Sequence, residues 1–394
     1  MRRAAANTVQ RWIHPERCFS GVSHHSESAL RKYAESKKSC TETRRQQPTR
    51  SNMQPQNSRE IRLKHRAVGL PSASDFELTE TPVPTPHEGQ VLVRNSYISV
   101  DPYMRGRMTE QKSYVPPFQI GEPLTGGAIG QVVASKSASF APGDCVQSMY
   151  GWREWYACDA REVQKIDPTL GPIQSYLGAL GMTGLTAYAG LLVIAQLKHG
   201  DRVFVSAASG AVGAIACQIA KAKGCYVVGS VGSEAKAAYL TQELGVDQAI
   251  NYKTTDGLTN AVAAAFPDGI DVYFDNVGGA HLQAALANMR QFGRIAACGM
   301  IAQYNATEPL PGPNNLGNII GLRLSIRGFL VGDHLGLHSQ FLGDMARWHG
   351  EGKMKWRETI SNGIESAPDA FIGLFKGEHI GKVLVRVGPD EAVK

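Results

Sequence analysis

The sequence predicts an α/β protein with a β-rich first domain and a second domain built on a doubly wound parallel sheet. From residue 61 to about residue 177, short alternating runs are separated by Pro and Gly turns, which is typical of antiparallel β structure. From about residue 178, strands alternate with helices, which is typical of a parallel sheet. We expect four segments in order: a disordered basic tail (1–55), the β-rich domain (56–177), the parallel-sheet domain (178–338) and a C-terminal return to the first domain (339–394).

The individual elements follow from the same patterns. Strands are expected in the β-rich domain at residues 76–79, 90–100, 126–134 and 144–149. The parallel-sheet domain begins with a helix at 180–192 and has a second helix at 214–222. Its six expected strands lie at residues 203–205, 226–231, 249–250, 272–275, 294–297 and 324–329. A helix at 339–351 and one strand at 383–387 follow, and a lone closing strand suits a return to the first domain.

A glycine turn between a strand and a helix marks the first candidate binding site. Val203-Phe204-Val205 reads as a buried strand that runs into Ala208-Ser209-Gly210-Ala211-Val212-Gly213 and an apolar helix. This is the opening of a Rossmann dinucleotide fold, with Ala208 in place of the first glycine. Gly210 and Gly213 let the backbone approach a pyrophosphate, and the helix N-terminus directs free N–H groups at it. The candidate residues here are Gly210, Ala211, Val212 and Gly213.

The end of the next strand indicates NADPH rather than NADH as the coenzyme. NAD-binding proteins place an acid there for the ribose 2′-hydroxyl, but no Asp or Glu occurs from Ser209 through Ser233. Instead, Gly232-Ser233 is followed by Lys236, and a small-residue turn with a cation can accept a 2′-phosphate. Glu234 lies close enough to act as the ribose-binding acid, in which case NADH would be used as well.

The charge is concentrated in the tail. The first 52 residues hold eleven Lys/Arg and four Asp/Glu, whereas the rest of the chain holds 30 and 31, so the net charge of +6 comes from the tail. The folded part therefore gives no electrostatic reason to expect nucleic acid or a membrane as partner. No apolar run reaches about 18 residues, the length needed to span a bilayer. Seven scattered cysteines without a CxxC motif fit a reducing compartment.

The tail itself allows three interpretations. Residues 1–20 are Arg-rich and acid-poor and can form an amphipathic helix, as in a mitochondrial transit peptide. The next thirty residues stay polar, however, and Met53 directly precedes the first structured segment. An upstream extension with Met53 as the working start is favoured, and a functional basic tail is the third reading. We expect a cytoplasmic protein, or a mitochondrial matrix protein if residues 1–20 act as a transit peptide.

Four separated motifs resemble those of one enzyme family. They are Val100-Asp101-Pro102-Tyr103-Met104-Arg105-Gly106-Arg107-Met108, Gly181-Met182-Thr183-Gly184-Leu185-Thr186-Ala187-Tyr188, Phe274-Asp275-Asn276-Val277-Gly278-Gly279 and Cys298-Gly299-Met300-Ile301-Ala302-Gln303-Tyr304-Asn305. The sequence from about residue 61 to residue 387 resembles the zinc-independent medium-chain reductases, in the branch of the prostaglandin/leukotriene, plant double-bond and bacterial curcumin reductases. The resemblance implies a GroES-like catalytic domain, a Rossmann domain, NADPH, and reduction of a C=C bond conjugated to a carbonyl. It also implies a homodimer joined through the edge strand near residues 324–330.

The resemblance extends to individual coenzyme-binding residues. Lys236 matches the family lysine that pairs with the 2′-phosphate, and Tyr252 matches the tyrosine at the adenosine phosphate. The family asparagine of the C-terminal segment is replaced by His379, whose imidazole has a different reach. The remaining residues that the family places at the coenzyme are Asn276, Cys298, Gly299, Met300, Ile301, Phe329, Leu330 and Val331.

Ligand counting predicts no metal site. Zinc alcohol dehydrogenases need a Cys after the first long strand and a Gly-His-Glu further on. The corresponding stretches here are Val100-Asp101-Pro102-Tyr103 and Gly121-Glu122-Pro123, without Cys or His. Tetrahedral zinc requires three or four such ligands.

Hydride transfer without a metal requires another group for the carbonyl oxygen. As hydride reaches the β-carbon of an enone or enal, negative charge grows on that oxygen, and a hydroxyl donor can stabilise it. Tyr304 is the first candidate and Tyr103 the second, because a phenol stays protonated at neutral pH. The proton for the α-carbon can come from a tyrosine or from water. Arg105 and Arg107 read as structural or surface residues rather than as anchors for a substrate carboxylate.

Two other functions fit the same coenzyme site. An NADPH-dependent quinone reductase would pass the hydride to a quinone instead of an enone. A non-enzymatic NADPH-binding protein would bind the coenzyme without consuming it. The loops at 109–119 and 301–318 are expected to set the size of the substrate pocket, since both are Pro-rich loops that can move.

Overall fold

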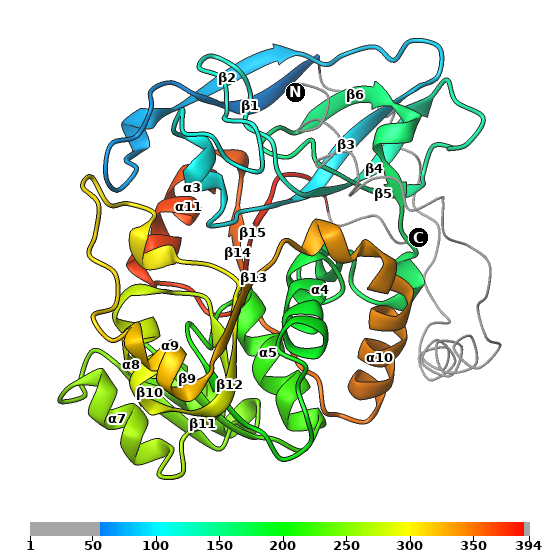
Figure 1. Ribbon diagram of the computed structural model, residues 1–394. Coiled ribbons are helices and arrows are strands. Elements are labelled where there is room, and N and C mark those ends of the chain that lie inside the picture. The colour runs from blue at the N-terminus through cyan, green and yellow to red at the C-terminus, as the bar shows by residue number, and fades with distance from the viewer. Residues whose placement is uncertain (1–55, 390–394) are drawn as a thin grey trace.

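The computed structural model describes residues 56–389 and arranges them in two parts (Figure 1). The predictions for the basic tail, the transit peptide and Met53 lie outside the described residues. One part is built on antiparallel strands, and the other on a parallel sheet covered by helices. The α/β class with a β-rich domain and a Rossmann-type parallel sheet is therefore confirmed.

The β-rich part contains a hairpin and a seven-stranded sheet. The hairpin pairs β1 (Asn57–Leu63) with β2 (Phe76–Pro82). In the larger sheet, the order is β14-β15-β3-β4-β5-β7, and β6 pairs with β3. The strands are β3 (Gln90–Ser99), β4 (Ala128–Ser135), β5 (Cys145–Ser148), β6 (Trp155–Asp159), β7 (Gln164–Lys165), β14 (Glu358–Asn362) and β15 (Lys382–Arg386). β3 is central because nearly all of its residues are buried, so it can accept neighbours along its whole length.

The parallel sheet has six strands in the order β10-β9-β8-β11-β12-β13. All five strand pairs are parallel, and the chain order reverses between β8 and β11, which creates the crevice where nucleotides bind in such sheets. The strands are β8 (Arg202–Val205), β9 (Tyr226–Val231), β10 (Gln248–Asn251), β11 (Ile270–Asp275), β12 (Met289–Ala297) and β13 (Ser325–Gly328). Each of the six predicted strands is present.

Helices cover both faces of this sheet (Figure 1). One face packs against α4 (Met182–Ala189), α5 (Ala211–Ala222) and α10 (His338–Gly350). The other face packs against α7 (Leu258–Ala265), α8 (Gly279–Asn288) and α9 (Gly317–Leu322). The helix expected at 180–192 is α4 followed by a π-helical turn at Gly190–Ile194. The other α-helices among residues 56–389 are α3 (Met104–Arg107), α6 (Glu234–Ala238) and α11 (Ala367–Lys376).

The C-terminal segment returns to the β-rich sheet after α10. The α10 residues Phe341, Met345 and Trp348 belong to the core beside α4, so this helix lies with the parallel sheet. β15 then pairs antiparallel with β3 and parallel with β14. β14 has no counterpart among the predicted strands.

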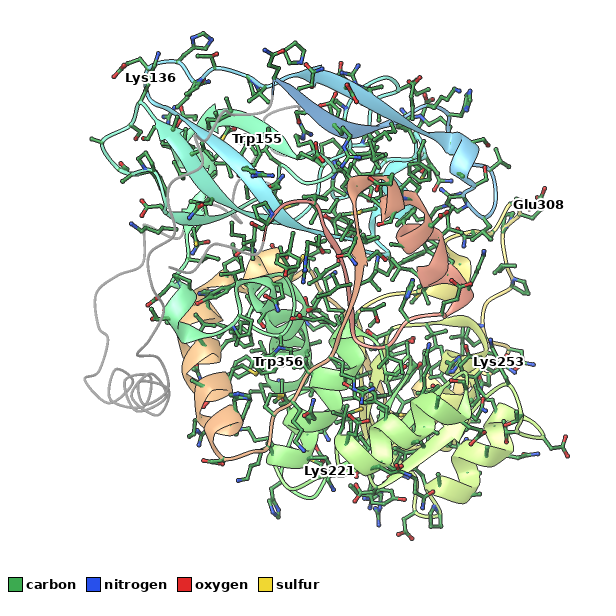
Figure 2. The ribbon with its side chains drawn as sticks, turned by 180° about the vertical axis from the view of Figure 1, so that it is seen from behind. Lys136, Trp155, Lys221, Lys253, Glu308 and Trp356 are labelled. Carbon is green, nitrogen blue, oxygen red and sulfur yellow. The ribbon has the colours of Figure 1, made fainter. Side chains whose placement is uncertain are left out.

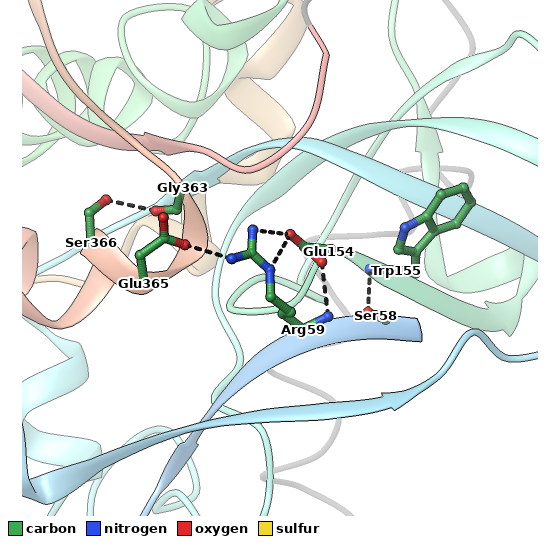
Figure 3. A network of polar contacts seen from close by, with 7 residues as sticks. All are labelled: Ser58, Arg59, Glu154, Trp155, Gly363, Glu365 and Ser366. Carbon is green, nitrogen blue, oxygen red and sulfur yellow. Dashed lines mark hydrogen bonds and ion pairs between the residues drawn. The ribbon is translucent and has the colours of Figure 1, made fainter. Parts of the chain in front are cut away.

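A polar network ties the first strand to the C-terminal segment (Figure 3). Arg59 on β1 donates from Nη2 to Glu154 at 2.7 Å and forms an ion pair with Glu365 at 3.0 Å. The backbone N–H of Arg59 also donates to Glu154 at 2.9 Å. Because the Arg59 side chain is partly exposed, these contacts fix geometry more than they add stability.

Candidate active site

A cavity of about 930 Å³ is lined by residues from both parts of the molecule. Tyr103 and Arg107 reach it from the segment after β3, and Lys382 from β15. Gly210 and Asn276 reach it from the carboxyl ends of β8 and β11, the two strands at which the sheet order reverses. The volume lies in the range of small-molecule and coenzyme pockets.

The cavity brings together nearly all residues expected at the site. Met300 does not line it: the Met300 side chain packs at Gly278, and its backbone N–H donates to the Tyr304 hydroxyl at 3.4 Å. The expected residues that line the cavity are Tyr103, Tyr304, Gly210, Ala211, Val212, Gly213, Lys236, Tyr252, Asn276, Cys298, Gly299, Ile301, Phe329, Leu330, Val331 and His379.

The turn before α5 has the form of a phosphate cradle. Gly210 is the N-cap of α5 and contributes no side-chain cap, so the first N–H groups of the helix stay available. A Cβ on Gly213 would lie 2.4 Å from the backbone oxygen of Ala207, so only glycine allows this close packing. Gly381 donates its N–H to Ser209 at 2.8 Å and thereby holds the C-terminal segment against the turn. The arrangement fits a pyrophosphate at the helix N-terminus.

One end of the same cavity, at and near α6, is basic. Lys236, Lys253 and Lys376 all line it, together with Tyr252, and Figure 2 shows Lys253 on the parallel-sheet part of the molecule. Burial lowers the pKa of Lys236, and the positive charge of Lys253 lowers it further, so an anion between them would relieve the repulsion. Lys236 Nζ donates to the backbone oxygen of Gly377 at 2.8 Å, which orients it. This donor set fits a phosphate monoester.

Glu234, the alternative ribose-binding acid, points elsewhere. Its Oε1 accepts a hydrogen bond from Asn251 Nδ2 at 2.6 Å, and Glu234 does not line the cavity. A carboxylate engaged at the strand end in this way leaves the basic end without a competing negative charge.

Asn276 is held by a buried network at the carboxyl edge of the sheet. Its backbone N–H donates to Ser206 Oγ at 2.9 Å, and its Nδ2 donates to the Ser206 backbone oxygen at 2.7 Å. Asp275 Oδ1 accepts from the Tyr273 hydroxyl at 2.7 Å and from the Gly278 N–H at 2.8 Å. Burial raises the pKa of Asp275, and these bonds to its ionised form oppose that rise. The network therefore fixes the turn from which Asn276 faces the cavity.

His379, which the sequence comparison with the family predicts to replace an asparagine, lines the cavity with a defined orientation. One of its ring nitrogens, Nε2, lies 3.2 Å from the Ala370 backbone oxygen. Since a carbonyl oxygen can only accept, Nε2 must carry the proton, and in the neutral ring Nδ1 is then an acceptor. An asparagine amide would offer both a donor and an acceptor, so His379 presents a different pattern to a ligand.

Two phenols expected to be catalytic face the cavity from opposite parts. Burial raises the pKa of Tyr304, an effect opposed by the hydrogen bond from Met300. Burial and the negative charge of Asp101 raise the pKa of Tyr103, whereas Arg107 lowers it. Both hydroxyls therefore stay protonated at neutral pH and can donate hydrogen bonds.

Sequence reasoning missed a third phenol and an ion pair. Tyr114 lines the cavity from the loop after α3, and 48% of this residue is exposed to solvent. Asp101 and Lys382 form a buried ion pair at 2.8 Å in the cavity wall, and Ser99 also donates to Asp101. The only sequence signal for Tyr114 is its position in the Pro-rich loop that was expected to shape the pocket.

The two arginines after Tyr103 are both buried. Arg107 lines the cavity, donates to the Pro116 and Thr125 backbone oxygens at 2.9 and 3.1 Å, and stacks on Phe118. Arg105 donates to the backbone oxygens of the loop before β2 and to one side chain of the Tyr304 segment. These contacts agree with the structural role expected for both residues.

Residues 56–389 hold neither a metal-binding cluster nor a membrane-spanning helix. No group of three or more His, Cys, Asp or Glu side chains in this range is placed to hold a metal ion. No helix in the same range combines the length and apolar composition needed to cross a bilayer.

Family models and similar proteins agree with this architecture. Residues 59–166 match the N-terminal domain of oxidoreductases, and residues 211–348 match a domain described as zinc-binding dehydrogenase. The chain is 47% identical to a putative NADP-dependent oxidoreductase (YfmJ) of Bacillus subtilis over 84% of its length and 98% of that protein. It is 44% identical to an NADP⁺-dependent 2-alkenal reductase of Nicotiana tabacum over 85% of its length and 98% of that protein.

A solved structure is also similar along the whole described chain. The crystal structure of CurA from Vibrio vulnificus in complex with NADPH superposes with a TM-score of 0.81 and 41% identity, covering 84% of this chain and 99% of that one. The alternating architecture, the glycine turn and these similarities lead to one assignment. The chain belongs to the zinc-independent medium-chain dehydrogenase/reductase family, in the branch of the alkenal, curcumin and prostaglandin reductases.

Proposed function

We propose that this protein is an NADPH-dependent reductase of the C=C bond of α,β-unsaturated aldehydes and ketones. One observation carries the proposal: a single cavity contains a phosphate cradle and basic end at one side and two protonated phenols at the other. The alkenal reductase of tobacco and the curcumin reductase of Escherichia coli, whose names state such activities, support the same assignment.

The nucleotide side of the cavity selects the coenzyme. NADPH, when bound, supplies the hydride for the β-carbon of the substrate. Gly210 and Gly213 leave room for its pyrophosphate, and Lys236, Lys253 and Tyr252 surround the place for its 2′-phosphate. A charged phosphate between two lysines gains strong hydrogen bonds that an unmodified ribose cannot form, so NADPH is preferred over NADH.

The phenols act on the carbonyl group of the substrate. Tyr304 is proposed to donate its hydroxyl proton in a hydrogen bond to the carbonyl oxygen, where negative charge accumulates as the enolate forms. Tyr103 is proposed as a second donor from the opposite wall. The α-carbon then takes a proton from one of these hydroxyls or from water. Apolar residues such as Val115, Leu177 and Met182 line the same cavity and suit the hydrocarbon part of an enal.

A turnover assay tests this function directly. Loss of NADPH absorbance is followed with 2-nonenal and with a panel of enones, and again with a quinone acceptor. We expect consumption with the enals and enones and the formation of saturated carbonyl products. Turnover confined to the quinone would indicate a quinone reductase, and coenzyme binding without consumption by any acceptor would indicate a non-catalytic protein.

We also propose a homodimer formed through β13. This strand lies at the edge of the parallel sheet, and all four of its residues are exposed, including Ile326 at 39%. An exposed edge strand offers unpaired backbone groups that a second copy can satisfy. Light scattering of the purified protein measures the assembly, and an Ile326→Arg variant is expected to shift it towards monomer.

The proposed compartment is the cytoplasm, or the mitochondrial matrix if residues 1–20 direct import. The five cysteines among the described residues form no disulfide and are mostly buried, which suits a reducing compartment. Fluorescence imaging of the full chain and of a variant lacking residues 1–20, each fused to a reporter at the C-terminus, distinguishes the two locations.

A further inference from the structure

A buried arginine connects the two segments that carry the proposed catalytic phenols. Arg105 lies on α3, two residues after Tyr103, and Asn305 directly follows Tyr304. The Arg105 Nε–H donates to Asn305 Oδ1 at 3.0 Å, although the two residues lie 200 positions apart in the chain. We propose that Arg105 and Asn305 form a latch that sets the separation of the two phenols across the cavity. The proposal rests on the reductase function above, in which both phenols act on one substrate oxygen.

The β-rich side of this latch is rigid. Arg105 is only 3% exposed, and its Nη2 donates to the backbone oxygens of Ala67 at 3.2 Å and Gly69 at 2.9 Å. The Nε–H that reaches Asn305 also contacts the Gly69 backbone oxygen at 3.3 Å. Because a guanidinium is planar, these bonds from Nε and Nη2 fix the direction of all its N–H groups. The Nε–H therefore points at Asn305 without needing Asn305 to hold it there. The bond between Arg105 and Asn305 therefore positions the segment that carries Tyr304. It is not needed to position Arg105 itself.

The loop around Gly69 also lies close to the segment that follows Tyr304. Gly69 has a φ of +70°, and a Cβ built on it would lie 3.5 Å from Thr307 Cγ2 and 4.0 Å from the Asn305 backbone oxygen. The loop around Gly69 and the segment 305–307 are thus in contact at the seam between the two parts. The hydrogen bond between Arg105 and Asn305 is part-buried at this seam, so its attraction is less screened than that of a fully exposed bond.

The latch acts on the cavity only through its neighbours. Tyr103, Tyr304 and Asn305 line the cavity, whereas Arg105 does not. Arg105 and Asn305 are therefore positioning residues. Without their bond, the segment that begins at Ile301 can move away from α3, and Tyr304 moves with it. A misplacement of about 1 Å can cost about 100-fold in rate even when no reacting group is altered.

Three variants test the latch in the full-length enzyme. Asn305→Ala removes the acceptor from a half-buried position, so it avoids the folding risk of replacing Arg105. We expect it to lower kcat for an enal about 10-fold or more, with KM for NADPH within about two-fold of wild type. Asn305→Asp keeps an acceptor oxygen for the guanidinium and is expected to retain at least about half of kcat. Asn57→Ala loses an exposed side-chain bond on β1 at 3.4 Å and is the control with unchanged kcat.

A double-mutant comparison separates the latch from a general structural effect. If Asn305 acts by placing Tyr304, Asn305→Ala should cost less than about two-fold in a Tyr304→Phe background. An unchanged kcat in Asn305→Ala overturns the latch while wild-type turnover leaves the proposed function standing. Losses that multiply in the double variant, or equal losses in Asn305→Asp and Asn305→Ala, also overturn it. A wild-type enzyme that reduces no enal or enone overturns the proposed function and the latch together.

Discussion

The hydroxyl oxygen of Tyr304 lies 3.4 Å from the backbone nitrogen of Met300, within the turn that follows β12. The Met300 N–H can only donate, so the Tyr304 oxygen is the acceptor and its own proton remains free for another partner. A Cβ on Gly299 would also lie 3.4 Å from this oxygen, so the hydroxyl is packed closely against the turn. Gly299 adds no side chain to this turn, and the backbone N–H of Met300 binds the phenol oxygen. The turn thereby presents the Tyr304 proton to the cavity.

Replacing Tyr304 by Phe should separate catalysis from coenzyme binding. Removal of a preorganised oxyanion donor costs about 100- to 1,000-fold in kcat in known cases, and we expect a loss in this range with 2-nonenal. NADPH binding, followed by quenching of protein fluorescence, should be nearly unchanged because the ring remains. Unchanged turnover would remove Tyr304 from the mechanism and leave Tyr103→Phe as the next variant to assay.

Replacing Lys236 by Ala should weaken NADPH binding selectively. A charge-assisted hydrogen bond contributes about 1.5–3 kcal/mol, which corresponds to an increase in KM for NADPH of roughly 10- to 100-fold. KM for NADH should hardly change, since that coenzyme carries no 2′-phosphate. Lys136→Ala, at an exposed position in the β-rich part far from the basic end (Figure 2), is the matched control. Equal losses for the two coenzymes would contradict the assignment.

An alanine at Gly213 should disrupt the phosphate cradle. Its methyl group would lie 2.4 Å from the Ala207 backbone oxygen, so the turn or α5 must shift. We expect lower thermal stability and a loss of NADPH affinity of at least about 10-fold, measured by calorimetry. Gly343→Ala on α10, where an added Cβ meets nothing within 4 Å, is expected to leave both quantities unchanged or to raise the melting temperature.

The stability of the fold should depend on pH through His281. Burial lowers the pKa of this cavity-lining residue to about 4, from the usual value near 6.5. Below about pH 6.5 the unfolded chain binds a proton at this position that the folded protein does not bind. Stability is therefore expected to fall as pH decreases from about 6.5 towards 4, by at most about 1.4 kcal/mol per pH unit from this group.

Urea unfolding at pH 7.5, 6.0 and 5.0 measures this dependence. Wild type and His281→Phe are compared because phenylalanine fills a similar volume beside Tyr252 without titrating. The variant should show a shallower loss of stability with acidification. If stability falls equally steeply with decreasing pH in both proteins, groups other than His281 control the loss of stability in acid.

The parallel sheet could be predicted from the sequence because each of its strands and helices has a recognisable local pattern. Strands such as Val203–Val205 are buried on both faces and appear as short apolar runs, and the glycine turn before α5 has a spacing that phosphate binding requires. β14 has no such signal. Its sequence, Glu358–Asn362, is mostly polar, and it becomes a strand only because β15 lies beside it.

The cavity wall was predicted less completely for a related reason. Tyr304 and Tyr103 lie in recognisable motifs, but the pairing of Asp101 with Lys382 joins positions 281 residues apart. The exclusion of Met300 from the cavity depends on how the chain turns after β12. Such features depend on how the two folded parts pack against each other. They therefore cannot be predicted from local propensity or residue spacing.

The position of β15 has a consequence for how the molecule is made. β3 is complete when residue 99 has been synthesised, yet its partner β15 begins only at residue 382. At a translation rate of about 5–20 residues per second, β3 waits roughly 15 to 55 s for that neighbour. β6 pairs with residues 90–94 of β3, so the part that remains unpaired on the ribosome during this interval is the stretch 97–99. Association of nascent chains along that stretch is a hazard that chaperones would have to suppress.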